Sequence, residues 1–270
     1  MMGAAARRAA LLAWTGIVFA FIFAPIVSTI AFSFNSARFP SLPWAGFSLE
    51  WYEDVLTDAT IRGSLANSLI VAGITAVIAT FIGFATAYVD YRYRFIGKPL
   101  YMALAALPPT VPVVILGVAM LTFEARLGLS GSLTGIIVAH VVLCTPFAMA
   151  LVRMRLADLD PDLEPAAWNL GASLWRTMSG VVVPFCTAAL LAAFFMAAAV
   201  SFDEFMIAWF VSGTHETLPV RLLDMLQGQV SPRINAVGSL VFAVSITLVA
   251  LAQLLSARRA SSVARRGRDG

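Results

Sequence analysis

The chain carries six long stretches without a formal charge, and these stretches fix the solvent in which it folds. Each exceeds the roughly 20 apolar residues that an α-helix needs to cross a hydrocarbon layer of ~30 Å. Mean hydropathy is +0.87 and 60% of the 270 residues are hydrophobic, more than a soluble fold of this size can cover. The stretches are Ala9–Ala37, Gly63–Val89, Pro99–Phe123, Leu127–Val152, Thr177–Phe202 and Ile234–Ala257.

These stretches predict an all-α membrane protein, since backbone groups in hydrocarbon must be paired within their own segment. We expect a single domain over residues 1–270. The first span follows Arg7 and Arg8, as a signal peptide would, but its apolar run is too long and no small-residue cleavage site follows it, so we expect it to stay uncleaved. The six transmembrane helices are expected at about 10–33, 63–89, 99–122, 132–152, 178–210 and 234–256.

Positive charge is concentrated on one side of this topology. The ends and alternate loops hold 13 of the 18 basic residues, and the other side holds five. Positive residues collect in cytoplasmic segments, so both termini are predicted to be cytoplasmic. The basic tail Arg258–Arg268 is interpreted as an anchor beside lipid headgroups and not as a nucleic-acid site. The five residues of the other side are Arg38, Arg62, Arg126, Arg221 and Arg233.

Two segments depart from plain spans. The outer segment Asn35–Arg62 is predicted to hold an interfacial helix capped by Ser48, whose acids form either a solvated face or an attraction for a cation. The third span contains Pro108, Pro109 and Pro112, which predict a kinked or broken helix, because proline removes a backbone donor. That break either lines a path or is only structural.

The few chemically active side chains within the spans do not form a catalytic or metal site. Cys144 and Cys186 are far apart in sequence and have no metal-ligand spacing, so we expect them to be packing residues. His140 in the fourth span is either a hydrogen-bonded packing residue or part of a proton relay. We therefore predict neither a catalytic residue nor a cofactor.

The longest cytoplasmic connection, residues 153–180, contains the most specific pattern. A helix is predicted over Asp162–Leu170, with Asp162 as N-cap, Pro165 in the first turn and Gly171 as the C-terminal stop. Ser173 is expected to cap the next helix. A single apolar stripe follows from the spacing i, i+3, i+4 and i+7 of Leu163, Ala166, Ala167 and Leu170. Such a helix lies either against lipid headgroups or in a groove on a soluble partner. The small alanines favour the partner.

This loop resembles the EAA loop of the permease subunits of ABC importers. The family pattern is E-A-A, three residues, G, nine residues, I-x-L-P. Ala166, Ala167, Gly171 and Pro184 match its spacing, and Val181 and Val183 are conservative replacements. Pro165 stands where the motif has its glutamate, and Glu164 comes one residue earlier.

The resemblance implies the type I ABC importer permease fold, in which this loop forms a coupling helix seated in a cleft of a cytoplasmic ATPase. The chain has no phosphate-binding G-x-x-x-x-G-K-[ST] motif, so ATP binding and hydrolysis are expected in that partner. The resemblance also implies a location in a bacterial inner membrane. The implied partners are a second, different permease subunit, two ATPase subunits and an extracytoplasmic solute-binding protein. The residues implied in ATPase coupling are Leu163, Glu164, Ala166, Ala167, Leu170 and Gly171.

The C-terminal part bears on the solute. The stretches Ser201–Phe205, Phe210–Gly213, Thr217–Val220 and Val230–Ala236 resemble the second permease subunit of spermidine/putrescine-type importers. Asp203 and Glu204 follow a long apolar run, and charged residues in a span usually face a bundle interior or a cavity. They are candidate stations for a small cation such as a polyamine, with Trp209 and Phe210 as aromatic neighbours. Alternatively, the two acids only fix helix packing or an outer gate.

Other functions remain open on the sequence. Relatives that carry other small solutes, such as an amino acid derivative, a quaternary amine or another organic ion, share parts of the same pattern. A secondary transporter driven by an ion gradient predicts inverted repeats, and the chain shows no clear internal symmetry. A membrane enzyme requires a nucleophile–base pair or a metal cluster, which two isolated histidines do not supply.

Overall fold

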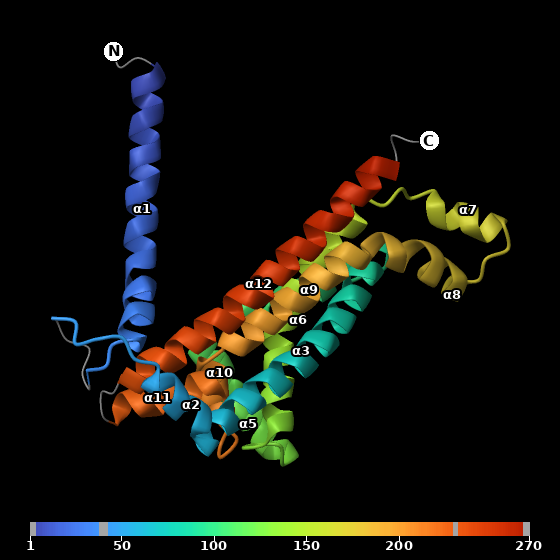
Figure 1. The fold of residues 1–270 in the computed structure, drawn as a ribbon. Coiled ribbons are helices and arrows are strands. Elements are labelled where there is room, and N and C mark those ends of the chain that lie inside the picture. Colours follow the sequence, from blue (N-terminus) through green and yellow to red (C-terminus); the bar gives the residue numbers. More distant parts are fainter. Residues whose placement is uncertain (1–3, 38–42, 229–231, 267–270) are drawn as a thin grey trace. The chain divides into compact units, whose positions relative to one another are not determined.

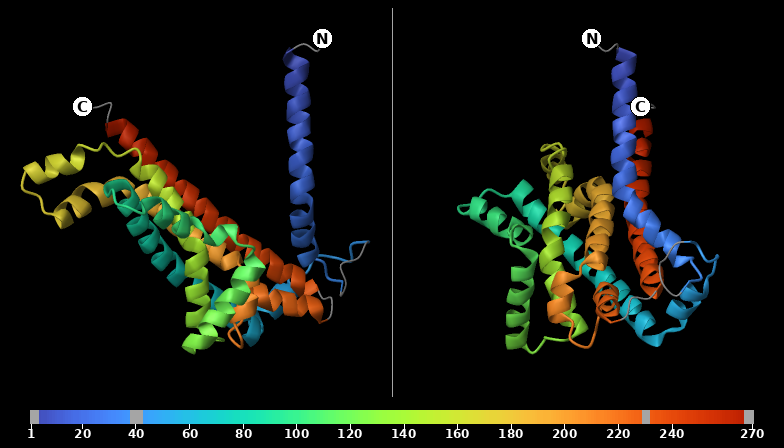
Figure 2. Two further views of the ribbon diagram at one scale, coloured as in Figure 1. Left: turned by 180° about the vertical axis from the view of Figure 1, so that it is seen from behind. Right: turned by 90° about the vertical axis from the view of Figure 1, so that its left-hand side faces the viewer.

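The computed structural model describes residues 4–37, 43–228 and 232–266, and within them every named element is helical. Figure 1 shows the helices in chain order, and Figure 2 gives two further views. The chain forms two compact units, Met1–Arg62 with Arg221–Ala243 (unit 1) and Gly63–Val220 with Val244–Gly270 (unit 2). The all-α prediction is confirmed, and the single domain over residues 1–270 stays a prediction. Expectations for residues 38–42, 229–231 and Arg268 fall outside the described residues.

Five helices in the described part of the chain are long and apolar enough to cross a membrane. They correspond to five of the six expected spans, and the expected span 99–122 is divided between shorter helices. The five are Arg7–Ser33 within α1 (Ala4–Ser33), α3 (Ala59–Arg92), α6 (Leu133–Leu156), Leu174–Asp203, and Pro232–Leu251 within α12 (Pro232–Arg266).

The proline-rich third span is broken. Helix α4 (Lys98–Ala106) ends before the single 3₁₀ turn η1 (Pro108–Thr110), and helix α5 (Val113–Leu127) starts directly after Pro112. Proline cannot donate to the preceding turn, and it restricts the residue before it to extended backbone, as the φ of −80° and ψ of 134° at Val111 show. The predicted interruption is thus a full break.

The fifth span starts earlier and ends earlier than expected. It consists of α8 (Leu174–Thr177), the π-helical turn η2 (Met178–Val182) and α9 (Val183–Asp203), without interruption. The expectation of a helix through residue 210 is wrong, because Glu204 is extended and the short helix α10 (Met206–Val211) begins after it. This break places Asp203 and Glu204 at a helix end.

Small side chains let the helices of unit 2 approach closely. One core cluster joins Ala148 and Val152 of α6 with Cys186 and Ala193 of α9, and all four are fully buried. A second cluster joins Ile136 and Ala139 of α6 with buried residues of α5 and α10. The two cysteines are buried and form no disulfide, which agrees with the predicted packing role. Small residues at such contacts are typical of helix packing in membranes, where backbone proximity replaces the hydrophobic effect.

Unit 1 is organised around the short helix α2 (Glu50–Thr57). The Tyr52 hydroxyl lies 2.8 Å from Ser33 Oγ at the end of α1, and Trp51 Nε1 donates to the Asn35 carbonyl. The expected cap Ser48 accepts from the Glu50 N–H, but the N-cap position belongs to Leu49, which makes no side-chain cap. Val55 of this helix is buried, whereas Leu56 is exposed.

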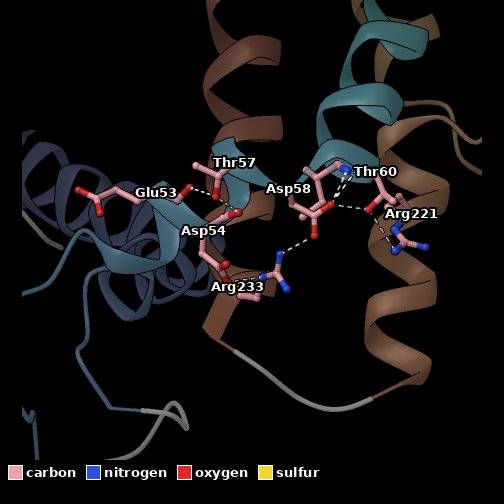
Figure 3. Close-up of polar contacts among 8 residues, drawn as sticks. Glu53, Asp54, Thr57, Asp58, Thr60, Arg221 and Arg233 are labelled. Carbon is pink, nitrogen blue, oxygen red and sulfur yellow. Dashed lines mark hydrogen bonds and ion pairs between the residues drawn. The ribbon is translucent and has the colours of Figure 1, made fainter.

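Arg233 pairs with two acids, one in α2 and one directly after it. Arg233 at the start of α12 pairs with Asp54 at 2.8 Å and with Asp58 at 2.7 Å (Figure 3). Asp58 also accepts from the N–H and hydroxyl of Thr60, so it caps the start of α3. No group of three or more metal-ligating side chains occurs in the described ranges. These contacts favour a structural role for Asp54 and Asp58 over the attraction of a cation.

These contacts predict a pH effect on stability. The hydrogen bond from Thr60, together with the pairing to Arg233, holds the pKa of Asp58 well below its usual range, against the opposing effect of burial. A lowered folded-state pKa gives stability that is present above the unfolded pKa of about 3.9 and is lost as pH falls toward the folded value. We expect Asp58→Asn to flatten the fall in melting temperature of the detergent-solubilised chain below pH 4. Glu53→Gln, a change at an exposed carboxylate of α2, should leave the wild-type slope. An unchanged slope in Asp58→Asn would contradict the assignment.

Candidate functional site

The loop of residues 153–180 forms the short helix that its sequence predicts. Helix α7 (Leu163–Asn169) ends with Gly171 at a φ of +83°, a left-handed conformation that glycine adopts without strain. The Ala172 N–H then donates to the Ala167 carbonyl at 3.0 Å, which closes the helix end. Asp162 occupies the N-cap position but makes no side-chain cap. Ser173 caps α8 by accepting from the Arg176 N–H, as expected.

The apolar stripe of α7 is largely exposed in the chain. Leu170 is 89% exposed and Leu163 is 44% exposed, and Trp175, at the start of α8, is 81% exposed. Ala166 is exposed and Ala167 is partly covered. A surface of large apolar side chains beside two alanines fits a partner better than water, because exposed apolar patches of this kind mark contact sites.

The opposite face of α7 is anchored to the end of α3. Glu164 is only 2% exposed, and its Oε2 lies 3.2 Å from Arg92 Nε and accepts from the Tyr88 hydroxyl at 3.1 Å. The Arg92 guanidinium also lies 4.5 Å from the ring centre of Trp168, one turn further along α7. Glu164 therefore points away from the stripe and into the chain.

A second ionic cluster holds the same end of α3 to its neighbours. Asp90 Oδ2 lies 2.5 Å from Arg153 Nε at the end of α6, and Asp90 Oδ1 lies 3.1 Å from Lys98 Nζ at the start of α4. Lys98 also donates to the Asp90 carbonyl. Sequence reasoning counted Arg92, Lys98 and Arg153 only as topology signals. Asp90 and Arg153 are 63 residues apart in the chain, so no local pattern shows their pairing.

The candidate translocation residues divide into two kinds. Glu204 accepts from the N–H groups of Ile207 and Ala208, both at 3.0 Å, and thereby caps α10. It also lies 3.5 Å from Nε2 of His140, which is fully buried and makes its other ring contact with the Ser201 hydroxyl at 2.8 Å. These contacts are those of a packing histidine. They also engage both carboxylate oxygens of Glu204 within the protein.

Asp203 and Trp209 are in more open positions. Asp203 accepts from the Ser245 hydroxyl at 2.5 Å and is otherwise exposed, and Trp209 is half exposed. Phe210 packs edge-to-face against Trp209 and covers Gly117 of α5, where an added Cβ would lie 2.6 Å from its ring. Of the four candidates, only Asp203 and Trp209 present a free face in this chain.

Sequence reasoning also missed Glu124. It lies near the end of α5, is fully buried and has no hydrogen-bond partner among the described residues. A Cβ on Gly135 would lie 2.6 Å from its Oε2, so the carboxyl group sits beside the first turn of α6. The positive end of a helix is a favourable place for such a group.

Residues 79–262 match the family described as binding-protein-dependent transport system inner membrane component. The chain belongs to this family. It is therefore a multi-pass component of the inner membrane and serves in transport. The match includes helix α7, the ionic cluster at Asp90 and the break at Glu204.

Curated members of the family are similar over most of the chain. The spermidine/putrescine transport system permease protein PotC of Haemophilus influenzae is 30% identical over 241 residues, covering 89% of this chain and 93% of that protein. The putrescine transport system permease protein PotI of Escherichia coli K12 is 32% identical over 232 residues, covering 83% and 82%. These matches confirm the resemblance to the permeases of polyamine importers.

Solved importers share the fold at lower identity. A bacterial ABC transporter involved in the import of the acidic polysaccharide alginate matches with a TM-score of 0.72 at 16% identity, covering 92% of this chain and 94% of that one. A chain of the MetNI methionine ABC transporter matches with a TM-score of 0.59 at 21% identity, covering 75% and 95%. The predicted importer permease fold is confirmed by these likenesses.

Proposed function

We propose that this chain forms half of the translocation path of an ATP-driven importer and is moved by a cytoplasmic ATPase bound at α7. The observation that carries the proposal is the two-sided character of α7. One face is fixed to the chain by Glu164 and Trp168, and the other presents Leu163 and Leu170 to the outside. A helix that is fixed on one face can transmit a displacement of the bound ATPase to the rest of the chain instead of rotating about its own axis.

The partners follow from the same arrangement. Two ATPase subunits bind at the coupling helices of this chain and of a second, different permease subunit, and a solute-binding protein delivers the solute from the other side. Both termini lie in the cytoplasm, together with α7, because most of the basic residues share that side. ATP is bound and hydrolysed by the ATPase subunits alone.

The solute is proposed to be a small organic cation, and putrescine or spermidine is the first choice. Support comes from the names of the curated relatives and from Asp203, an exposed carboxylate at the end of a long apolar helix. Trp209 adds an aromatic face near the same helix break, where a cation gains from the ring. Glu204 is left out of this contact, since its carboxylate caps α10.

The docking role is tested by Ala167→Arg in the intact complex. A charged side chain in the middle of the stripe must be desolvated on docking, and we expect ATPase retention during purification to fall roughly tenfold or more. Asn169→Arg is the matched control, because it adds the same charge to an exposed position of α7 outside the stripe. Equal retention by both variants would refute docking at the stripe.

The energy source is tested separately with the purified chain in liposomes. Uptake of labelled putrescine is expected only when the second permease, the ATPase and the binding protein are present together with ATP. Uptake by the chain alone under an ion gradient would overturn the proposal in favour of a secondary transporter.

A further inference from the structure

We propose that the Glu164–Arg92 pair is the link by which α7 moves α3, so that these two residues act as positioning residues in energy coupling. The inference rests on the proposed function, and it adds how a push on α7 enters the membrane-spanning helices. It also gives Glu164 a role distinct from that of the exposed stripe on the same helix.

The first support is the way in which α3 holds Glu164. The carboxylate is almost completely buried, and both of its partners, Tyr88 at 3.1 Å and Arg92 at 3.2 Å, come from the last turns of α3. Burying a carboxylate is costly unless it is paired and hydrogen-bonded, and removing one partner leaves a buried charge uncompensated. Sliding of α7 along α3 would break these contacts, so the two elements should move together.

The second support is that α7 contacts Arg92 through two side chains. Glu164 and Trp168 are four residues apart, so they share one face of the helix. The guanidinium of Arg92 pairs with the carboxylate of Glu164 and lies over the indole of Trp168 at 4.5 Å. Two contacts one turn apart fix the direction of α7 as well as its position. A lysine would supply the charge but not the planar stacking.

The third support is the connection of α3 to further helices. Two residues before Arg92, Asp90 pairs with Arg153 of α6 and with Lys98 of α4. A displacement that reaches α3 through Arg92 is therefore passed at once to the ends of α6 and α4. Helix α6 in turn packs along α9, the helix that ends at Asp203. The end of α3 is thus the junction between the coupling loop and the spans.

The shift in motif register explains why this glutamate is available. Glu164 precedes the position at which Pro165 replaces the glutamate of the family pattern. One residue turns the side chain by roughly 100° around the helix axis. At position 164 the side chain reaches α3, whereas Pro165 is exposed and only borders the small pocket that Tyr91, Arg92 and Glu164 help to line.

The experiment measures whether α7 and α3 move as one body. Spin labels are placed at Asn169→Cys on α7 and at Ile96→Cys just beyond α3, both exposed positions outside the stripe. The native Cys144 and Cys186 are buried, so labelling is directed to the introduced residues. Distances between the labels are recorded in the intact complex with and without ATP, and also in the chain alone in lipid nanodiscs.

The expected result is one narrow distance distribution that ATP does not change. In Glu164→Gln and in Arg92→Gln the distribution should broaden, in the complex and in the chain alone, while the ATPase is retained. The double variant should be no broader than the wider single variant, because both changes remove the same contact. Asp162→Asn, an exposed acid next to α7 without a side-chain cap, should keep the narrow distribution.

Two results would overturn the link. The first is an unchanged distribution in Glu164→Gln. The second is loss of the ATPase from Glu164→Gln with the narrow distance preserved, which would assign Glu164 to docking. Failure of the parent complex to retain any ATPase would instead count against the proposed function, and the measurement on the chain alone would still decide the link.

Discussion

Replacing Gly83 by alanine is expected to destabilise the chain, although alanine is the better helix former. A Cβ at this position of α3 would lie 2.7 Å from the Met149 backbone nitrogen and 2.9 Å from the Ala148 Cβ of α6. One of these atoms belongs to the helix backbone and the other is a Cβ, so neither can move away by a side-chain rotation. Overpacking of this kind costs about 1–3 kcal/mol, which exceeds the gain of up to about 1 kcal/mol in helix propensity. The melting temperature of the detergent-solubilised chain measures the difference.

Gly73 provides the matched control on the same helix. An added Cβ there meets nothing within 4 Å, so Gly73→Ala should gain from helix propensity without a steric cost. The two variants are therefore expected to shift the melting temperature in opposite directions. A shift of the same sign in both would mean that α3 and α6 are not held at this distance in the membrane protein.

The spans and the helix of the loop 153–180 were predictable because both follow from local patterns. An uncharged run longer than the bilayer is thick predicts a helix without reference to any other part of the chain. The stripe, the terminal Gly171 and the Ser173 cap likewise depend on residues within one or two turns, and the structure places all of them as expected.

The helix breaks were predictable only where a residue forces them. The three prolines of the third span predict its interruption at η1. The break after Asp203 has no such signal, since Phe205 and the residues beyond it are as apolar as those before. It is stabilised by Glu204, which satisfies two N–H groups of α10 and contacts His140 on another helix. A tertiary contact of this kind cannot be read from a hydropathy pattern.

The same limit applies to charge. Composition treats Arg92, Arg153 and Lys98 as equivalent markers of the cytoplasmic side, but the fold pairs each with a specific acid. Glu124, which follows directly after an uncharged stretch, is fully buried. Burial and pairing depend on which helices become neighbours, and that information is distributed over the whole chain.

The other large effect is expected from Glu204→Gln. The carboxylate is 93% removed from solvent, and it accepts from two backbone N–H groups at once. A glutamine can accept one of these bonds, but its amide NH₂ would face the other N–H, which is then buried without a partner. Such a group costs about 1–3 kcal/mol. We expect a lower melting temperature of the solubilised chain and a corresponding loss of assembled complex.

Asp203→Asn separates structure from transport, because the two acids are neighbours with different surroundings. Asparagine can still accept from the Ser245 hydroxyl, and position 203 is exposed, so the melting temperature should change little. Removal of the negative charge should nevertheless reduce putrescine uptake by the complete complex if Asp203 receives the cation. Loss of stability equal to that of Glu204→Gln would make Asp203 a structural residue, and full uptake at full stability would remove it from the path. The solute would then have to contact other residues, because the carboxylate of Glu204 already accepts two N–H groups of α10.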